Sequence, residues 1–233
     1  MNKRFFEIDV IRGVAILLVV FYHFIFDLTY FRFAQIELYT GFWLYFQRVA
    51  ATLFVLIFGI CISISANRKN YELSFLKRTL KLGVLAAFIT LVTWVFVPGE
   101  FIRFGIIHFF AVATVISLFF VKLGKWNLPI GVLIILSGLY LNTIESTNPF
   151  LLPLGLLTIG IKTLDYFPLL PWFGVVLIGI AIGDYVYNKR KFVLNVKENK
   201  VTTFLSLIGR HTLAIYLVHQ PIIIAGLVLI GLV

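Results

Sequence analysis

The chain has 233 residues, of which 61% are hydrophobic and 13% charged, and its mean hydropathy is +1.03. A typical soluble domain is about half apolar and about a quarter charged. This composition excludes a water-soluble globular enzyme, a disordered chain and a secreted disulfide scaffold; Cys61 is the single cysteine. The net charge of +10 would suggest nucleic acid for a soluble protein, but basic residues beside membrane helices account for it, so we expect no nucleic-acid partner.

Apolar runs separated by short polar linkers predict seven membrane-spanning helices, because a spanning helix needs about 20 apolar residues. We place these helices at about 9–28, 42–65, 77–97, 104–122, 128–144, 170–187 and 210–232. The apolar segment 150–161 is too short to span and contains Pro153, so it is predicted to be re-entrant or interfacial. The expected fold is an all-α polytopic helix bundle with about seven transmembrane helices, formed by a single domain over 1–233.

Lysine and arginine are distributed unequally between alternate linkers. With the N-terminus in the cytoplasm, the outer loops hold three basic residues, Arg32, Arg103 and Lys162, and the cytoplasmic segments hold fourteen. The cytoplasmic group consists of Lys3, Arg4, Arg68, Lys69, Lys77, Arg78, Lys81, Lys122, Lys125, Lys189, Arg190, Lys191, Lys197 and Lys200. This bias predicts an integral cell-membrane protein with a cytoplasmic N-terminus and an extracytoplasmic C-terminus.

Polar residues inside a membrane helix mark candidate functional sites, and the first predicted helix contains Arg12, His23 and Asp27. Arg12 and His23 are 11 residues apart, which places them on one helix face and roughly 16 Å apart along the axis. Asp27 follows His23 by four residues on that face, where a carboxylate can orient the imidazole ring. Arg12 also lies near the membrane boundary, so pairing with Glu7 or Asp9 is an alternative to ligand binding.

Further candidates lie near the ends of other predicted helices. Arg48 is near the start of the second helix, while Arg103 and His108 flank the start of the fourth. Such residues can bind substrate or anchor a helix end at the interface, and the sequence leaves both roles open. The last predicted helix adds polar or aromatic positions and one proline: Arg210, His211, Tyr216, His219, Gln220 and Pro221. His219 is expected near mid-membrane, where Pro221 frees a backbone carbonyl one turn earlier.

The sequence contains no Walker motif, dinucleotide-binding fingerprint, zinc pattern or Gly-x-Ser-x-Gly motif, and we expect no metal. Two terminal stretches, together with His23 and Asp27, resemble the prokaryotic heparan-α-glucosaminide N-acetyltransferase-like family. They read Phe6-Glu7-Ile8-Asp9-Val10-Ile11-Arg12-Gly13-Val14-Ala15-Ile16 and Gly209-Arg210-His211-Thr212-Leu213-Ala214-Ile215-Tyr216-Leu217-Val218-His219-Gln220-Pro221. Arg12 followed by His23 is also similar to the first-helix signature of the wider group of transmembrane acyltransferases that modify cell-surface glycans.

This resemblance implies transfer of an acyl group, in the first place acetyl from cytosolic acetyl-CoA, to a hydroxyl or amine of an extracytoplasmic glycan or similar small acceptor. The lysosomal enzyme of the family carries its proposed active histidine after the first helix, whereas residues 29–40 contain no histidine here. The catalytic role is therefore assigned to His23, and the glucosamine substrate is not carried over. A homodimer in the lipid bilayer is compatible with this reading.

The resulting hypothesis gives each candidate residue a role. The catalytic group consists of His23 as general base or transient acyl carrier, Asp27 as the carboxylate that orients it, and His108, Tyr216 and His219 as donors to the developing oxyanion. The residues that would bind acyl-CoA are Arg12, Arg210 and His211, and those that would bind the acceptor are Arg48, Arg103 and Gln220. The alternative is a proton-coupled transporter of a small or lipid-linked solute with the His/Asp pair as relay, although the sequence shows no inverted repeat.

Overall fold

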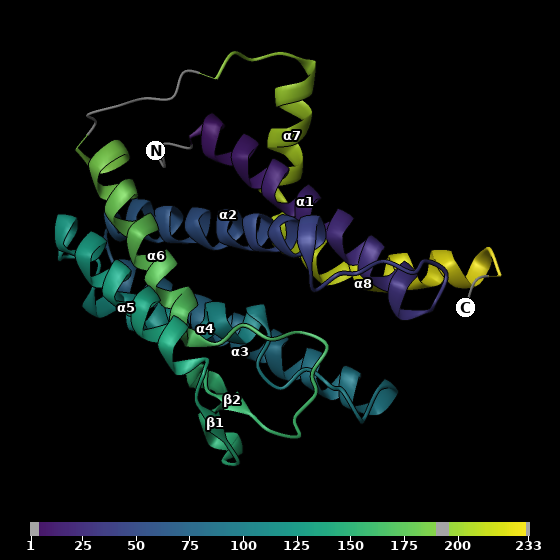
Figure 1. The fold of residues 1–233 in the computed structure, drawn as a ribbon. Coiled ribbons are helices and arrows are strands. Elements are labelled where there is room, and N and C mark those ends of the chain that lie inside the picture. The colour runs from purple at the N-terminus through teal and green to yellow at the C-terminus, as the bar shows by residue number, and fades with distance from the viewer. Residues whose placement is uncertain (1–4, 190–195, 232–233) are drawn as a thin grey trace. The chain divides into compact units, whose positions relative to one another are not determined.

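The computed structural model describes residues 5–189 and 196–231, and Figure 1 shows how its helices run. Six of the described helices are long and apolar enough to cross a membrane. They are α1 (Phe6–Tyr30), α2 (Gly41–Ala66), α3 (Tyr71–Phe96), α5 (Asn127–Leu141) preceded by the 3-10 turn η2 (Gly124–Trp126), α6 (Leu169–Gly183) followed by the π-helical turn η4 (Asp184–Asn188), and α8 (Thr212–Leu229). The protein is an all-α polytopic membrane protein, as the sequence predicts.

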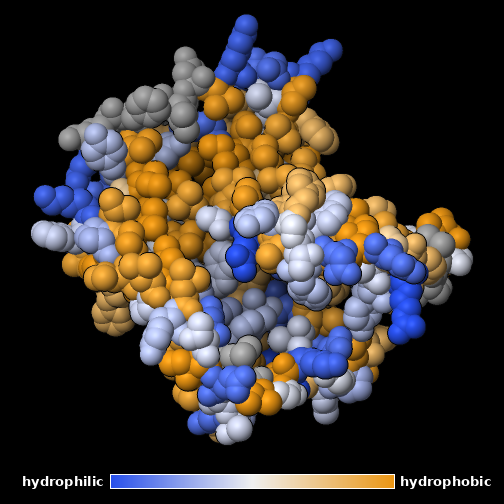
Figure 2. Space-filling view, in the orientation of Figure 1, coloured by the Kyte–Doolittle hydropathy of each residue, from blue (hydrophilic) through white to orange (hydrophobic). Residues whose placement is uncertain are grey.

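Large apolar side chains cover much of the surface visible in Figure 2. On α3, for example, Leu80, Val84 and Phe88 are 65%, 70% and 62% exposed. Exposed apolar residues of this size on a spanning helix are in contact with lipid, because water would not tolerate so much apolar surface. Four basic residues that contribute to the predicted orientation lie outside the described residues: Lys3, Arg4, Arg190 and Lys191.

The fourth predicted span, 104–122, is only partly helical. Helix α4 (Ile106–Ile116) continues as the 3-10 turn η1 (Ser117–Phe119), and the two together form an apolar helix that is shorter than the other spans. The side-chain nitrogen of Asn127 donates to the carbonyl oxygens of Phe120 and Gly124 at 3.0 and 3.1 Å. These bonds fix a turn that ends the helix before the predicted boundary, although the apolar run continues beyond it.

Segment 150–161 does not form a spanning helix. It contains most of the 3-10 helix η3 (Pro149–Leu154) and the strand β2 (Leu157–Thr158), which pairs in parallel with β1 (Glu145–Ser146). Pro153 lies inside η3 and lacks the N–H that a longer α-helix would need. The expectation that this segment is too short to span is confirmed, and its position relative to the lipid remains a prediction.

A helix that the sequence analysis does not predict, α7 (Lys200–Arg210), lies between the predicted spans 170–187 and 210–232 and ends at the first residue of the latter. Its start is fixed by Asn199, whose side-chain oxygen accepts from the Thr202 backbone N–H at 2.9 Å. The Thr202 hydroxyl in turn accepts from the Asn199 N–H at 2.9 Å, which completes a capping box. Helix α8 begins at Thr212 directly after His211, so the last span starts two residues later than predicted.

The chain divides into two compact units, one formed by Met1–Ile57 with Leu194–Val233 and the other by Phe58–Val193. The first unit contains α1, most of α2, α7 and α8, and the second contains the end of α2 and the helices from α3 to η4. The single domain expected over 1–233 remains a prediction.

In the first unit, α1 packs against both α7 and α8, and α7 lies beside the N-terminal half of α1 (Figure 1). The crossing of α1 and α7 leaves no room for side chains at two positions. A Cβ on Gly13 would overlap a carbonyl of α7, and one on Gly209 would overlap a carbonyl of α1 and lie 2.9 Å from the Gly13 nitrogen. Each glycine is next to an arginine in the sequence, so this close crossing also brings Arg12 and Arg210 towards one another.

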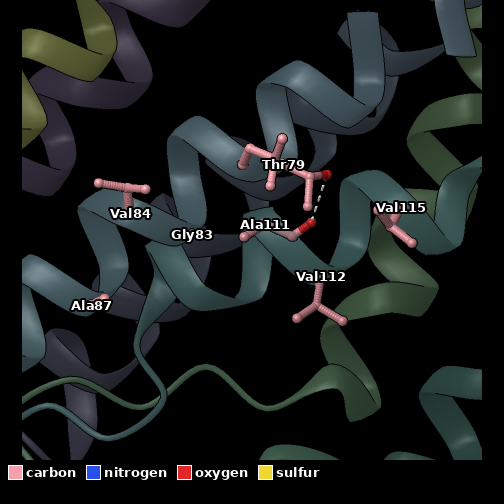
Figure 3. Close-up of a pocket in the computed structure, with 8 residues that line it drawn as sticks. Thr79, Gly83, Val84, Ala87, Ala111, Val112 and Val115 are labelled. Carbon is pink, nitrogen blue, oxygen red and sulfur yellow. Dashed lines mark hydrogen bonds between the residues drawn. The ribbon is translucent and has the colours of Figure 1, made fainter. Parts of the chain in front are cut away.

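In the second unit, α5 packs along α6 and α3 packs along α4. The Thr79 hydroxyl on α3 donates to the Ala111 carbonyl on α4 at 3.2 Å (Figure 3). Beside this bond is an open groove of about 530 Å³, lined by Thr79, Leu80, Gly83, Val84, Ala87, Ala111, Val112 and Val115. Its lining is almost entirely apolar and its hydroxyl, that of Thr79, already donates to Ala111, so the groove is assigned to contact with lipid.

Candidate active site

Two helices of the first unit, α1 and α8, bring together four residues that the sequence analysis singles out. The rings of His23 and His219 lie edge to face, with 4.8 Å between their centroids and 70° between their planes. The side-chain nitrogen of Gln220 donates to both carboxylate oxygens of Asp27, at 2.7 and 2.9 Å. His219 is 7% exposed and Asp27 2%, so these contacts lie inside the protein.

The hydrogen bonds of the two rings determine which nitrogen carries the proton. Nδ1 of His23 lies 2.9 Å from the Val19 carbonyl oxygen, and Nδ1 of His219 lies 2.6 Å from the Tyr216 carbonyl oxygen. A carbonyl oxygen only accepts, so each Nδ1 donates and each neutral ring carries its lone pair on Nε2. Nε2 of His219 is buried and has no hydrogen-bond partner among the described residues. The pair therefore presents basic nitrogens and not donors.

Asp27 contacts a different group from the one expected. Its spacing from His23 predicts that it orients the imidazole, but its carboxylate is held by Gln220. The Val19 carbonyl holds the His23 ring instead. A buried carboxylate needs donors, and the amide nitrogen of Gln220 donates to both of its oxygens from a position 193 residues away in the chain. Helical spacing predicts which side chains share a face of α1, but it cannot show that α8 provides the partner.

Tyr216 lies beside His219 on α8, with 5.2 Å between the ring centroids. Its ring stacks on Phe54 of α2, with 6.3 Å between centroids and 18° between planes. Helix α8 continues through Pro221, which has no N–H for the carbonyl of Leu217 one turn earlier. Aromatic packing on one side and a weakened stretch of helix on the other therefore flank the imidazole of His219.

Near the start of α1, the carboxylate of Asp9 lies between two guanidinium groups. Its Oδ1 is 3.4 Å from Nη1 of Arg12, and its Oδ2 is 3.5 Å from Nε of Arg210. Asp9 itself is buried, whereas the side chains of Arg12 and Arg210 are 31% and 43% exposed. The pairing of Arg12 with Asp9 that the sequence offers as one alternative is thus present, and it leaves part of each guanidinium accessible. Glu7 is a second buried acid in the same turn, and its Oε1 has no hydrogen-bond partner among the described residues.

Helix α1 is continuous, so Arg12 and His23 lie roughly 16 Å apart along its axis and on the same side of it. His211 follows Arg210 directly, is exposed, and donates through Nδ1 to the Leu207 carbonyl at 3.0 Å. The first unit therefore contains two groups of ionisable side chains. We call Asp9, Arg12 and Arg210 the arginine cluster, and His23, Asp27, His219 and Gln220 the imidazole cluster.

His108 belongs to the second unit, and both of its ring nitrogens are engaged there. The Thr90 hydroxyl donates its one proton to the Ile102 carbonyl at 2.7 Å, so it accepts from Nε2 of His108 at 3.0 Å. Nδ1 of His108 then accepts from the Gly105 backbone N–H at 3.3 Å. His108 therefore caps the start of α4 and connects it to α3. The sequence analysis proposes it as a donor to substrate, but in the structure its one donor faces Thr90.

The two remaining candidate arginines are Arg103 and Arg48. The guanidinium of Arg103 lies over the Phe101 ring, 4.0 Å from its centroid, and donates to the Lys162 carbonyl at 2.6 Å. Arg48 is exposed on α2.

In the loop that precedes α6, the Tyr166 hydroxyl donates to a carbonyl of η3 at 2.8 Å, and burial raises the pKa of this phenol to about 12. Tyr166 therefore stays protonated and serves as a structural donor between loop segments.

Several residues that shape these sites are absent from the sequence analysis. Asp165 accepts from the Ile106 backbone N–H at 2.9 Å and so caps α4 from a distant loop. The Val19 carbonyl that holds His23 has no side-chain signature at all. The cap by His108 has no sequence signature either, because Gly105 has no side chain and the pair forms only half of a capping box.

These helices and clusters define the class as a polytopic integral membrane protein with ionisable groups along a spanning helix. A family profile described as heparan-alpha-glucosaminide N-acetyltransferase, catalytic, matches residues 4–221, and the chain belongs to this family. The resemblance predicted from the two terminal stretches is thereby confirmed, and the protein is a membrane acetyltransferase. Searches of curated proteins and of solved structures gave no significant match.

Proposed function

We propose that the protein takes an acetyl group from acetyl-CoA bound at the cytoplasmic side and transfers it to a hydroxyl or amine of a glycan or similar small acceptor on the opposite side. The observation that carries this proposal is the arrangement of two clusters along α1, with guanidinium groups at one end and imidazole lone pairs near the other. Their separation of roughly 16 Å is about half of the hydrocarbon thickness of a bilayer. A thin pantetheine arm can cover this distance while the charged nucleotide stays at the surface.

The arginine cluster is proposed to bind the phosphates of acetyl-CoA. Arg12 and Arg210 are each partly exposed, and Asp9 holds both guanidinium groups in place. A guanidinium offers several N–H donors with the geometry that phosphate oxygens require. Phosphate would compete with Asp9 for these N–H groups. Because salt screens the attraction between phosphate and guanidinium, we expect acetyl-CoA to bind more weakly as salt is added. His211 is exposed next to Arg210 and is proposed as a further contact.

The imidazole cluster is proposed to carry out the transfer. Nε2 of His23 removes the proton from the acceptor as its oxygen or nitrogen attacks the thioester carbonyl. The new C–O or C–N bond forms, the C–S bond breaks, and the leaving CoA thiolate takes the proton back from the His23 imidazolium. His219 offers a second lone pair beside this proton. An acetyl-histidine route would use the same lone pair of His23 as the nucleophile.

The remaining groups are proposed to position and assist this pair. The bond between Asp27 and Gln220 joins α1 to α8 and so sets the distance between the two imidazoles. The Tyr216 hydroxyl is the proposed donor to the developing oxyanion. His108 is assigned to the cap of α4, because both of its nitrogens are engaged. Two arginines are retained as proposed contacts of the acceptor: Arg48 and Arg103.

The test uses purified protein in liposomes with radiolabelled acetyl-CoA outside and either glucosamine or glucose, an amine and a hydroxyl probe, trapped inside. We expect CoA release and labelled internal sugar from the wild type and from Phe24→Ala, but not from His23→Ala. Phe24 follows His23 on α1 and is 40% exposed, so its variant is a control for a local change. Equal turnover by His23→Ala would contradict the proposal. Label retained on the protein would indicate an acetyl-enzyme, and solute uptake driven by a proton gradient without CoA release would indicate a transporter.

A further inference from the structure

Helix α7 presents two different sides. Ser206 and Gly209 are buried in the packing against α1. Three large apolar side chains project on another side, where Val201, Phe204 and Leu207 are 66%, 60% and 53% exposed. Phe204 and Ser206 are about 160° apart around the helix axis, so this apolar ridge faces away from α1. Among residues 5–189 and 196–231, the contacts of α7 therefore leave this ridge largely exposed.

The chain fixes the level of α7 along the spanning helices. Gly209 meets α1 at Gly13, which lies about two turns after the start of α1 at Phe6. On its other side, α7 is separated from the start of α8 by His211 alone. Helix α7 therefore lies where two membrane-spanning helices begin, at the boundary between the hydrocarbon core and the headgroups.

The size and charge of this surface indicate what covers it. Three side chains bury at most on the order of 500 Å², whereas each partner in a standard protein interface contributes about 800 Å². Lys197 and Lys200 are exposed beside the first turn and Arg210 is exposed at the end, and they outnumber the one exposed acid, Glu198. A narrow apolar ridge with basic flanks suits a phospholipid surface better than a folded partner.

We propose that α7 is an interfacial helix that binds the membrane surface, with its apolar ridge among the acyl chains and Lys197 and Lys200 at the lipid phosphates. This binding does not depend on the transfer reaction, and the proposed orientation places it in the cytoplasmic leaflet. Because Arg210 ends α7, lipid contact also holds the arginine cluster at the level of the headgroups.

Spin labels at two adjacent positions test this binding. In a Cys61→Ala background, Phe204→Cys or Thr203→Cys is labelled and reconstituted into vesicles of phosphatidylcholine and phosphatidylglycerol. Thr203 is exposed and about 100° from Phe204 around the helix, so it is the matched control. We expect the label at 204 to be relaxed more strongly by apolar oxygen than by a water-soluble nickel complex, and the label at 203 to show the reverse.

Two results would overturn the proposal. Equal access of the nickel complex to both labels would place the ridge in water, and loss of access to both reagents at 204 would mean that protein covers it. Val201→Cys, about 160° from Thr203 around the helix, allows the same comparison if Phe204→Cys fails to fold. Lys197→Gln combined with Lys200→Gln tests the charge: the depth of the label at 204 should no longer depend on phosphatidylglycerol, and an unchanged dependence would refute the lysine contacts.

Discussion

The imidazole rings of His23 and His219 meet edge to face at 4.8 Å between centroids, and each ring donates to a backbone carbonyl through Nδ1. Both rings can therefore gain a proton only at Nε2. We predict that His23→Ala lowers kcat/KM by about 10² to 10⁴-fold and that His219→Ala lowers it less. The double variant should be no worse than His23→Ala, because both residues serve one proton transfer. Steady-state CoA release measures kcat/KM for the two single variants and the double variant. If the loss in the double variant equals the product of the two single losses, the two histidines have separate roles.

The bond between Asp27 and Gln220 is predicted to stabilise the first unit. Gln220→Ala removes the one amide nitrogen that donates to both oxygens of a carboxylate that is 2% exposed, and should lower the free energy of unfolding by about 2–3 kcal/mol. Asp27→Asn retains one hydrogen bond and removes the charge, so a smaller loss of about 1 kcal/mol is expected. Unfolding in detergent, followed by helical circular dichroism, measures both. Equal losses would mean that the carboxylate does not depend on this amide.

Gly13, at the crossing of α1 and α7, gives a second prediction about stability. An alanine at Gly13 would place a methyl group against a backbone carbonyl, and should destabilise the protein by about 3 kcal/mol or more. Gly83→Ala is the control, because a Cβ there meets no atom within 4 Å. Alanine at this position in α3 should be neutral or should stabilise by up to about 1 kcal/mol. If both variants unfold at the same temperature in detergent, the close crossing is not present in solution.

The arginine cluster is predicted to recognise the nucleotide part of the donor. Arg12→Gln and Arg210→Gln should each raise the KM for acetyl-CoA by about tenfold, the effect of losing about 1.4 kcal/mol. The KM for acetyl-pantetheine, which has no phosphate, should not change. Parallel steady-state measurements with the two donors separate binding of phosphate from a general defect. An equal rise for both donors would assign the arginines to structure alone.

His108 gives a prediction that distinguishes capping from catalysis. His108→Ala removes the partner of both Thr90 and the Gly105 N–H, and should reduce stability by about 1–2 kcal/mol. The kcat of the folded fraction should remain close to that of the wild type. Activity is measured below the unfolding transition and divided by the amount of monodisperse protein. A drop in kcat of about a hundredfold would restore His108 to the list of groups that act on substrate.

Most of the spanning helices could be predicted because hydrophobic runs of about 20 residues have few other uses. Helix α7 is too short for this signal, because it has only 11 residues; its helical spacing of apolar residues and its cap Asn199 are the signals that could have indicated it. The early end of α4 also has no hydrophobic signal, since it depends on hydrogen bonds from Asn127. Sequence hydropathy thus predicts the long spanning helices better than short helices and helix ends.

For the candidate site, the sequence identifies side chains but not their partners. Spacing along α1 correctly places Arg12 and His23 on one face, because one continuous helix relates them. It assigns Asp27 to His23, whereas the donor that reaches Asp27 comes from α8. Contacts between residues that are far apart in the chain depend on how helices pack, and a single sequence has no periodicity that reports this.

Only His211 lies between the end of α7 and the start of α8. Helix α7 also contacts α1 directly through backbone atoms at Gly13 and Gly209, so the two helices are closely packed at this point. His219 is only seven residues, or roughly 10 Å, beyond Thr212, the first residue of α8. The residue proposed to bind the nucleotide, Arg210, and the residue proposed to take part in the transfer, His219, therefore belong to one short stretch of chain with a single-residue joint between its two helices.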